Sequence, residues 1–270
     1  MGDDAFDVLI LIGRPASGKS EIIDFLTHIR PDVRCNRYQL GELDILDDFP
    51  LLWAWFEEDR ILSQQFGLPR IYTDERGYFN HPAYWHLLIE RLSLAYQRRL
   101  RDNPTYHEST TALVEFSRGS EHGGYHEALP HLADELLQKA AILYVNVSFA
   151  ESLRKNRRRF NPNRPDSILE HGLSDEKMEQ LYREDDWTEL APVAAGFVTV
   201  RAVRVPYVVF ENEDDVTTGK PELLAQRLDA VLGRLWKMYV ARELKEEYNK
   251  NAELTAFTAL DGEDFLSEND

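Results

Sequence analysis

A glycine-rich segment near the N-terminus carries the residues whose types and spacing most clearly predict chemistry. Residues 13–20 match the pattern G-x-x-x-x-G-K-[ST] in full. In order, they are Gly13, Arg14, Pro15, Ala16, Ser17, Gly18, Lys19 and Ser20. The glycines let successive backbone N–H groups point at phosphate oxygens, and a helix that follows would present its positive end to the same charge. The segment is therefore predicted to bind a nucleoside triphosphate.

Two side chains of this phosphate loop have individual predicted roles. Lys19 would reach the β- and γ-phosphates, and the hydroxyl of Ser20 would ligate magnesium, so ATP and Mg²⁺ are the expected ligands. The loop lies between an apolar run at residues 7–12, typical of a buried strand, and an amphipathic stretch at residues 19–29. Strand, loop and helix in this order are the context that the pattern requires.

A second candidate pair follows the predicted strand at residues 110–116. Glu115 lies at its carboxyl end, where open α/β sheets gather their active sites, and Arg118 comes three residues later. Glu115 would orient magnesium through water or accept a proton, and Arg118 would hold a phosphate. The alternative is that the two side chains simply pair with each other. Asp44 and Asp74 are further candidates for the general base.

A cluster of arginines stands out against the acidic background of the chain. Its members are Arg154, Arg157, Arg158, Arg159 and Arg164. On a helix, the first three can converge on one face, and the asparagines and prolines that follow predict a mobile loop at residues 160–172. This combination is typical of a lid that closes over transferring phosphates. Alternatively, the arginines pair with carboxylates such as Glu151, Glu170 and Asp175.

Strands alternate with helices along the chain, which predicts an α/β fold with a parallel sheet in a three-layer sandwich. Strands are expected at residues 7–12, 110–116, 141–147 and 205–210. Helices are expected at residues 19–29, 49–66, 84–100, 125–139 and 221–241, with another that starts near residue 148. His122 and His126 are expected to be surface or loop residues.

The predicted domain organisation is one domain over residues 1–241 followed by an acidic tail over residues 242–270. A helical insertion is expected at about residues 40–106 and the lid at about residues 154–187. Residues 40–81 are predicted to line the pocket for the molecule that accepts phosphate. Most aromatic residues of the insertion are expected to pack its helices.

Composition restricts the partners. The chain has 31 Lys and Arg against 48 Asp and Glu, and this net charge of −17 would repel nucleic acid and anionic membranes. Its one cysteine, Cys35, excludes a disulfide framework and fits a reducing cytoplasm. The apolar run at residues 8–12 is too short for a signal peptide or a membrane span.

Taken in order, these features resemble the P-loop kinase superfamily of adenylate, guanylate and nucleoside kinases. The features are the phosphate loop, a strand ending in an acidic residue, the arginine-rich helix, and a strand ending in Glu-Asn-Glu-Asp-Asp at residues 211–215. The resemblance implies that Asn212 packs near the nucleotide base and that Arg154 and Arg158 contact phosphates. From the residues alone, Asn212 could equally be a turn residue.

Departures from the family pattern limit what the resemblance implies. Adenylate kinase-like enzymes have Asp-Gly-x-Pro-Arg where this chain has Glu115-Phe116-Ser117-Arg118, so an AMP-type acceptor is not supported. There is no Asn-Lys-x-Asp guanine signature, which counts against a GTPase. Asp185-Asp186 is not in a strand context, which counts against a motor ATPase. We therefore expect an ATP- and Mg²⁺-dependent kinase for a small-molecule or nucleotide acceptor. The alternative is a nucleotide-binding regulatory protein that hydrolyses slowly or not at all and binds a protein partner.

Overall fold

The computed structural model describes residues 5–159 and 173–250 of the chain. The sheet that these residues form has six strands in the order β2-β3-β1-β4-β6-β5. The parallel strands are β2 (Glu42–Asp47), β3 (Thr110–Phe116), β1 (Val8–Gly13), β4 (Ala140–Asn146) and β6 (Val203–Glu211). The edge strand β5 (Ala195–Val200) runs antiparallel to β6.

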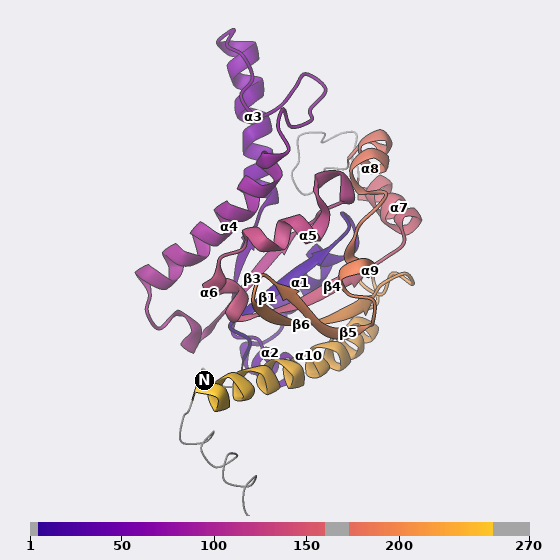
Figure 1. The fold of residues 1–270 in the computed structure, drawn as a ribbon. Helices are drawn as coiled ribbons and strands as arrows, with labels where there is room; N and C mark the ends of the chain where they lie inside the picture. The colour runs from indigo at the N-terminus through magenta and orange to yellow at the C-terminus, as the bar shows by residue number, and fades with distance from the viewer. Residues whose placement is uncertain (1–4, 160–172, 251–270) are drawn as a thin grey trace, which may run out of the picture.

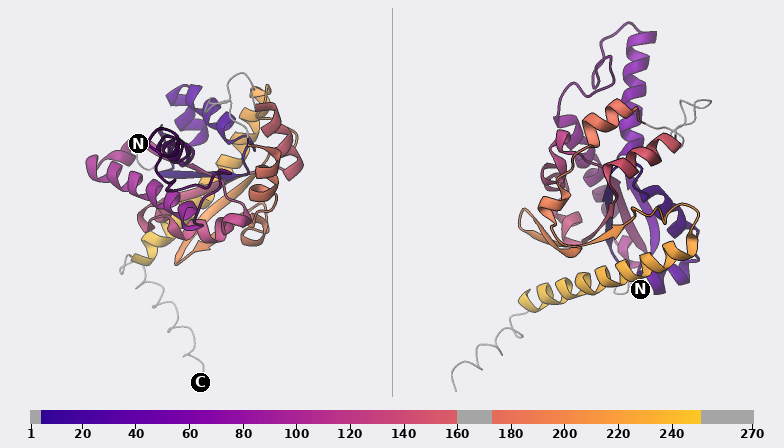
Figure 2. Two further views of the ribbon diagram at one scale, coloured as in Figure 1. Left: turned by 90° about the horizontal axis from the view of Figure 1, so that it is seen from above. Right: turned by 90° about the vertical axis from the view of Figure 1, so that its right-hand side faces the viewer.

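Helices cover both faces of the sheet, as Figures 1 and 2 show. One face carries α1 (Lys19–His28), α2 (Pro31–Tyr38) and the long α10 (Pro221–Lys250). The other carries α4 (Ala83–Asp102), α5 (Gly124–Ala128), η3 (Leu129–His131), α6 (Asp134–Gln138) and α9 (Trp187–Leu190). The short helices η1 (Tyr106–Glu108) and η2 (Ser120–His122) precede and follow β3. The predicted three-layer α/β sandwich is confirmed.

Strand β1 shows how the sequence builds two cores. Successive side chains of a strand point to opposite faces. Val8, Ile10 and Ile12 are therefore buried against the α4 side, while Leu9 and Leu11 are buried against α1 and α10. An unbroken apolar run is the sequence of a strand covered on both faces.

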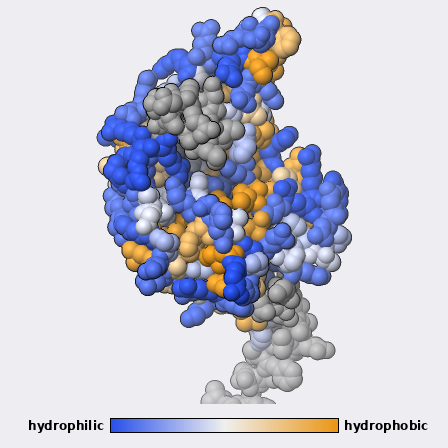
Figure 3. All heavy atoms as spheres, turned by 180° about the vertical axis from the view of Figure 1, so that it is seen from behind, coloured by the Kyte–Doolittle hydropathy of each residue, from blue (hydrophilic) through white to orange (hydrophobic). Residues whose placement is uncertain are grey.

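Helix α3 (Phe49–Gln65) stands away from the body of the molecule, as both Figure 1 and the right-hand view of Figure 2 show. In Figure 3, apolar side chains gather near the upper end of the molecule, where this helix ends. Phe66, Leu68 and Ile71 are exposed there. No helix in the described residues is long and apolar enough to cross a bilayer.

Several elements differ from the sequence predictions. Strand β2 and the antiparallel β5 were not predicted. The helix predicted at residues 125–139 is divided into α5, η3 and α6, because Pro130 lacks the N–H that a continuous helix needs. The predicted helix end at Pro31 is correct, but the same proline also begins α2, a position where its missing N–H costs nothing.

Of the predicted lid, the structure describes α7 (Phe149–Arg159) and α8 (Asp175–Tyr182). The segment predicted to be mobile, residues 160–172 with Arg164, lies outside the described residues. Helix α10 extends into the predicted acidic tail as far as Lys250, and the remainder of that tail is likewise outside them.

Candidate functional site

The phosphate loop joins β1 to α1, as the sequence predicts. Gly13 and Gly18 both have positive φ values, of 152° and 115°. A Cβ atom on Gly13 would lie 2.4 Å from the carbonyl oxygen of Val145, and one on Gly18 would lie 2.5 Å from Nδ2 of Asn212. Ala16 also has a positive φ, of 55°. Neighbouring strands therefore fix the loop closely, and a side chain at either glycine would displace it.

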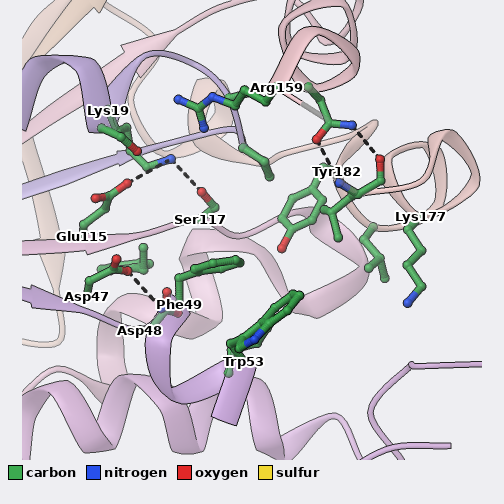
Figure 4. Close-up of a pocket in the computed structure, with 18 of the residues that line it drawn as sticks. Lys19, Asp47, Asp48, Phe49, Trp53, Glu115, Ser117, Arg159, Lys177 and Tyr182 are labelled. Atoms are coloured by element: carbon green, nitrogen blue, oxygen red, sulfur yellow. Dashed lines mark hydrogen bonds and ion pairs between the residues drawn. The ribbon is translucent and has the colours of Figure 1, made fainter. Parts of the chain in front are cut away.

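The side chain of Lys19 folds back over the loop. Its Nζ atom donates to the carbonyl oxygens of Gly13 and Arg14, at 3.2 and 3.1 Å, and to Oγ of Ser117 at 2.8 Å. The same atom lies 3.9 Å from Oε1 of Glu115, and Figure 4 shows both contacts to β3 and the turn after it. Burial lowers the pKa of Lys19, while Glu115 opposes the shift. The ammonium is thus held at the loop by partners that a phosphate can replace.

Three carboxylates meet at the carboxyl ends of β2 and β3. Asp47 is the register partner of Glu115, and Asp48 follows at the start of α3. All three line one cavity with Lys19. Asp47 and Asp48 were not among the predicted site residues. Strand β2 could have been found from the alternation Leu43, Asp44, Ile45 and from the two aspartates at its end.

The carboxylates have pKa values shifted by their surroundings. Burial, with the charges of Glu115 and Asp48, raises the pKa of Asp47 to about 7. Burial also raises the pKa of Glu115, against the opposing effect of Lys19, and that of Asp48, against the opposing effect of Arg118. A carboxyl group that titrates near neutral pH beside a phosphate loop is suited to exchange a proton with a substrate hydroxyl.

Arg118 pairs with Asp48 and not with Glu115. Its Nη1 lies 2.8 Å from Oδ2 of Asp48, and the two side chains are 1% and 7% exposed. Nη2 donates to the carbonyl oxygen of Trp85, whose ring lies 5.3 Å from the guanidinium carbon. In this arrangement the predicted phosphate-holding residue is engaged within the protein, where it positions Asp48 at the cavity wall.

His122 is buried, contrary to the prediction of a surface position, although it does lie in the turn after β3. Its ring stacks on Trp85 with centroids 3.8 Å apart and is 3% exposed. Burial, aided by the charge of Arg118, lowers its pKa to about 3. The prediction for His126, which is exposed, is confirmed.

The arginine cluster divides between two environments. Arg154 pairs with Glu151 at 2.6 Å and with Asp215 at 3.0 Å, while Arg158 lies 3.8 Å from Asp215. Arg157 pairs with Asp175 at 2.6 Å. None of these three arginines lines the cavity of the phosphate loop. The carboxylate pairing weighed as the alternative is the arrangement that this conformation shows.

Arg159 occupies the position that was expected of Arg154 and Arg158. It lines the cavity, and Figure 4 shows its guanidinium beside Lys19. Its Nη2 donates to both carboxylate oxygens of Glu21, at 2.7 and 2.8 Å. Arg159 is the last residue of α7, and its side chain points to the loop, while Arg157 and Arg158 face Asp175 and Asp215.

Asn212 supports the phosphate loop from behind. Its side chain is fully buried, and its Nδ2 donates to the carbonyl oxygen of Ser17 at 2.6 Å and to Oγ1 of Thr217 at 2.9 Å. Its Oδ1 accepts from the backbone N–H groups of Val216 and Thr217. With both ends of the amide engaged, Asn212 fixes the loop and the turn after β6 together, as the turn-residue alternative expects. Its packing near a nucleotide base stays a prediction.

The side chain of Arg14 points out of the loop. It lies 2.6 Å from Oδ2 of Asp185 and donates to the carbonyl oxygens of Val147, Tyr182 and Arg183. Only the backbone of Arg14 is thus available to a phosphate. Its side chain connects the loop to the segment that follows α8.

Asp44 and Asp74, the other candidates for the base, lie in different places. Asp44 is bound by Arg99 and accepts from the hydroxyl of Tyr106, and it does not line the cavity. Asp74 does line it, and its Oδ1 accepts from the backbone N–H of Tyr78.

The cavity has a volume of about 1660 Å³ and extends from the phosphate loop to α3, α8 and the segment before α4. The segment predicted to line the pocket contributes aromatic side chains together with charged ones such as Arg60, Arg70 and Asp74. The aromatic side chains include Phe49, Trp53, Phe56, Tyr78 and Phe79. On the opposite side lie Lys177 and Tyr182, as Figure 4 shows.

The described residues contain no group of three or more His, Cys, Asp or Glu side chains placed to hold a metal ion. The exposed hydroxyl of Ser20 and the carboxylate of Glu115 are oxygen ligands of the kind that Mg²⁺ prefers. Magnesium commonly takes one or two protein ligands and completes its shell with phosphate and water. The donor set fits a magnesium ion that arrives with a nucleotide.

A phosphate loop between β1 and α1, in a sheet whose parallel strands run β2-β3-β1-β4-β6 between helical layers, defines an α/β protein with a P-loop NTPase fold. No family model matches the chain, and no curated protein matches it either.

Among solved structures, the chain is similar to shikimate kinase from Acinetobacter baumannii in complex with shikimate. That match has 17% identity and a TM-score of 0.42, and covers 86% of this chain and 96% of the other. It is also similar to Chaetomium thermophilum Kti12 in complex with ADP-AlF3, with 13% identity, a TM-score of 0.43 and coverage of 83% and 98%. A third match is an unliganded sugar kinase from Janibacter sp., with 13% identity, a TM-score of 0.34 and coverage of 84% and 95%. These values are low, and the class stated above rests on the strand order and the phosphate loop.

Proposed function

We propose that this protein is an ATP- and Mg²⁺-dependent phosphotransferase that moves the γ-phosphoryl group to a hydroxyl of a small molecule. One observation carries the proposal: Lys19 of the phosphate loop and the carboxylates of Asp47, Asp48 and Glu115 face the same cavity. A loop used only to bind nucleotide needs no second space lined by titratable groups. A kinase needs that space for its acceptor.

The volume of the cavity supports two ligands. Sites for one drug-sized molecule occupy roughly 300–1,000 Å³, and this cavity has about 1660 Å³. The phosphate loop would hold the triphosphate at one end, and the aromatic side chains from residues 49–79 would hold the acceptor. The two substrates would then meet at Lys19 and the carboxylates.

In the proposed mechanism, Asp47 accepts the proton of the acceptor hydroxyl as that oxygen attacks the γ-phosphorus, and the bond from this phosphorus to the β–γ bridging oxygen breaks, which releases ADP. Lys19 moves from its carbonyl partners to the phosphate oxygens and stabilises their charge in the transition state. Arg159 lies beside Lys19 and would stabilise the same charge. Magnesium, held by Ser20 and the phosphates, would neutralise charge on the β- and γ-oxygens.

The test combines an acceptor screen with a loop variant. Purified protein is incubated with Mg²⁺ and γ-labelled ATP and with sugars, nucleosides, nucleotides and hydroxy acids, and label transfer is measured. The variant Lys19→Met should lower transfer by at least about 10²-fold, as loss of one transition-state contact does elsewhere. Lys237→Met, on an exposed face of α10, is the matched control. Equal rates for the wild type and Lys19→Met would remove the loop from the mechanism.

A regulatory nucleotide-binding protein is the second candidate, and the exposed apolar end of α3 favours it. Phe66, Leu68 and Ile71 are 66%, 52% and 53% exposed, and such a group of side chains is typical of a surface that binds another protein. ATP consumption that rises when a small-molecule metabolite extract is added supports the kinase. Tight ATP binding without turnover in that extract supports the regulator.

A further inference from the structure

Lys177 of α8 lies in an unusual setting, across the cavity from the phosphate loop. Figure 4 shows it across the pocket from Lys19, and Phe49, Trp53 and Tyr182 lie between the two lysines. The side chain is partly buried and lines the cavity. A substrate that reacts at Lys19 can therefore reach Lys177 only with a part remote from the reacting hydroxyl.

Among the residues that the structure describes, the ammonium group of Lys177 has aromatic rings and a backbone carbonyl as its neighbours, and no carboxylate partner. Its Nζ lies over the rings of Phe56 and Tyr78, at 5.8 and 5.3 Å from their centroids, and donates to the carbonyl oxygen of Gly77 at 3.0 Å. In the described part of the chain, no Asp or Glu oxygen lies within ion-pair distance of it. An ammonium has three N–H donors, so donors remain for a ligand.

The local backbone is shaped to admit this group. Gly77 has a φ of 75°, a conformation that favours glycine, and a Cβ atom there would lie 2.7 Å from Nζ of Lys177. Burial lowers the pKa of Lys177, and the more distant carboxylates of Asp74 and Glu176 oppose the shift. A partly desolvated cation gains most from an anion that approaches it, because water no longer screens the pair.

We propose that Lys177 determines acceptor specificity by binding an anionic group, a carboxylate or a phosphate, on the end of the acceptor remote from its reacting hydroxyl. The acceptor is then a ring-bearing hydroxy compound with a negative charge, since the wall between the two lysines is aromatic. The role of Lys177 in acceptor selection during catalysis rests on the proposed kinase function. The prediction that Lys177 binds an anionic group does not depend on that function.

The experiment compares probes that differ only in the charged group. Sugar phosphates are paired with their parent sugars, and cyclic hydroxy acids with their methyl esters, so that the phosphate and carboxylate arms are separate. Wild type, Lys177→Met and the control Lys237→Met are assayed for transfer from labelled ATP, with unfolding midpoints measured to check the fold. We expect the wild type to favour the anionic member of at least one probe pair. Lys177→Met should raise the KM for that anionic compound by about 10- to 100-fold.

The neutral compound of each probe pair shows whether Lys177 recognises the anionic group or has only a structural role. Under the proposal, Lys177→Met leaves the KM of the neutral compound and the affinity for ATP unchanged. A loss that is equal for both members of each pair would mean that Lys177 only ties α8 to the loop of Gly77. A wild type that prefers the neutral members would also overturn the proposal.

A binding measurement keeps the inference distinct from the proposed function. If the wild type transfers phosphate to no probe, the kinase function fails, and quenching of tryptophan fluorescence by the same probes is then measured with a non-hydrolysable ATP analogue. Trp53 and Trp85 line the cavity and report its occupancy. Binding of anionic probes that Lys177→Met abolishes supports the inference. Equal binding of both probe classes, or binding of neither, overturns it.

Discussion

Asp47 and Glu115 are register partners on adjacent parallel strands, and both line the cavity that contains Lys19. Burial disfavours the charged form of a carboxyl group, and a neighbouring carboxylate disfavours it further, so the two groups are not readily ionised together. The pKa of Asp47 rises to about 7, whereas Glu115 lies beside the ammonium of Lys19 at 3.9 Å. The two acids can therefore have different roles: Asp47 can exchange a proton near neutral pH, and Glu115 can form an ion pair with Lys19.

The first prediction concerns Asp47 as the general base. Asp47→Asn should lower kcat by about 10²- to 10⁴-fold while ATP affinity stays within about threefold. Asp74→Asn is the matched control, because Asp74 lines the same cavity and its amide would keep the contact to Tyr78. Steady-state kinetics with the identified acceptor provide the measurement. An Asp47→Asn enzyme with a normal kcat would assign the base elsewhere.

The second prediction is the pH dependence that follows from the same carboxyl group. Its carboxylate form is the base, so kcat/KM should rise with pH and level off above about 7. Stability should change in the opposite sense. The folded protein holds the proton of Asp47 more tightly than the unfolded chain, so this group's contribution to stability falls as pH rises from about 4 to about 7.

Asp47→Asn removes that titration and gives the check. Urea unfolding at pH 5 and pH 8 should show the variant gaining stability relative to the wild type at the higher pH. A wild-type minus variant difference that is constant over this range would mean that the pKa of Asp47 is not raised in the folded protein.

The sequence was sufficient for the strand–loop–helix unit and for the α/β architecture, because both follow from short-range patterns of apolar residues and glycine. It was insufficient for β2, an edge strand with Glu42, Asp44 and Asp47 among its six residues, since an edge position tolerates polar side chains. Missing β2 meant missing Asp47 and Asp48.

The directions in which side chains point were the other part of the candidate site that the sequence did not predict. The helical spacing of the arginines on α7 predicts that several share a face, but not which neighbours that face meets. Asp215 and Asp175 come from distant parts of the chain and hold Arg154 and Arg157, which leaves Arg159 at the cavity. The burial of His122 likewise depends on Trp85, from a helix whose packing no local pattern specifies.

The third prediction concerns the buried pair of Arg118 and Asp48. Arg118→Met should lower the free energy of unfolding by about 3–5 kcal/mol, because it leaves a buried carboxylate without its partner. In the double variant with Asp48→Asn, the loss should be clearly smaller than the sum of the two single losses. Arg30→Met, from an exposed pair with Asp32, should change the free energy of unfolding far less, because solvent screens that pair. Additive losses in urea unfolding would show that the pair is not coupled.

The fourth prediction separates the two neighbouring arginines at the end of α7. Arg159→Ala should reduce kcat by at least about tenfold with a smaller effect on ATP affinity, because its guanidinium lies beside Lys19 and acts on charge that develops during transfer. Arg158→Ala is the control, since that side chain is 60% exposed and lies outside the cavity. Single-turnover rates and ATP binding should be measured for both. A large kcat defect in Arg158→Ala alone would instead require α7 to rotate during turnover.

The last prediction concerns the support that Asn212 gives to the phosphate loop. Asn212→Asp replaces the amide nitrogen, which donates to Ser17 and Thr217, by a second oxygen, but keeps the oxygen that accepts from Val216. The substitution therefore removes the link to the loop and adds a carboxylate beside the carbonyl of Ser17. ATP affinity should fall by at least about tenfold, and the free energy of unfolding by about 1–3 kcal/mol.

Asn103→Asp is the matched control, because Asn103 is exposed and its side-chain oxygen, which caps Thr105, is retained. Calorimetric titration with ATP and Mg²⁺, together with urea unfolding, measures both effects. Because Asn212 donates directly to the carbonyl of Ser17 in the loop, the loss of affinity should exceed what a uniform loss of stability produces and should persist at temperatures well below unfolding. If Asn212→Asp binds ATP as tightly as the wild type, the glycines and β1 alone hold the loop in its binding conformation.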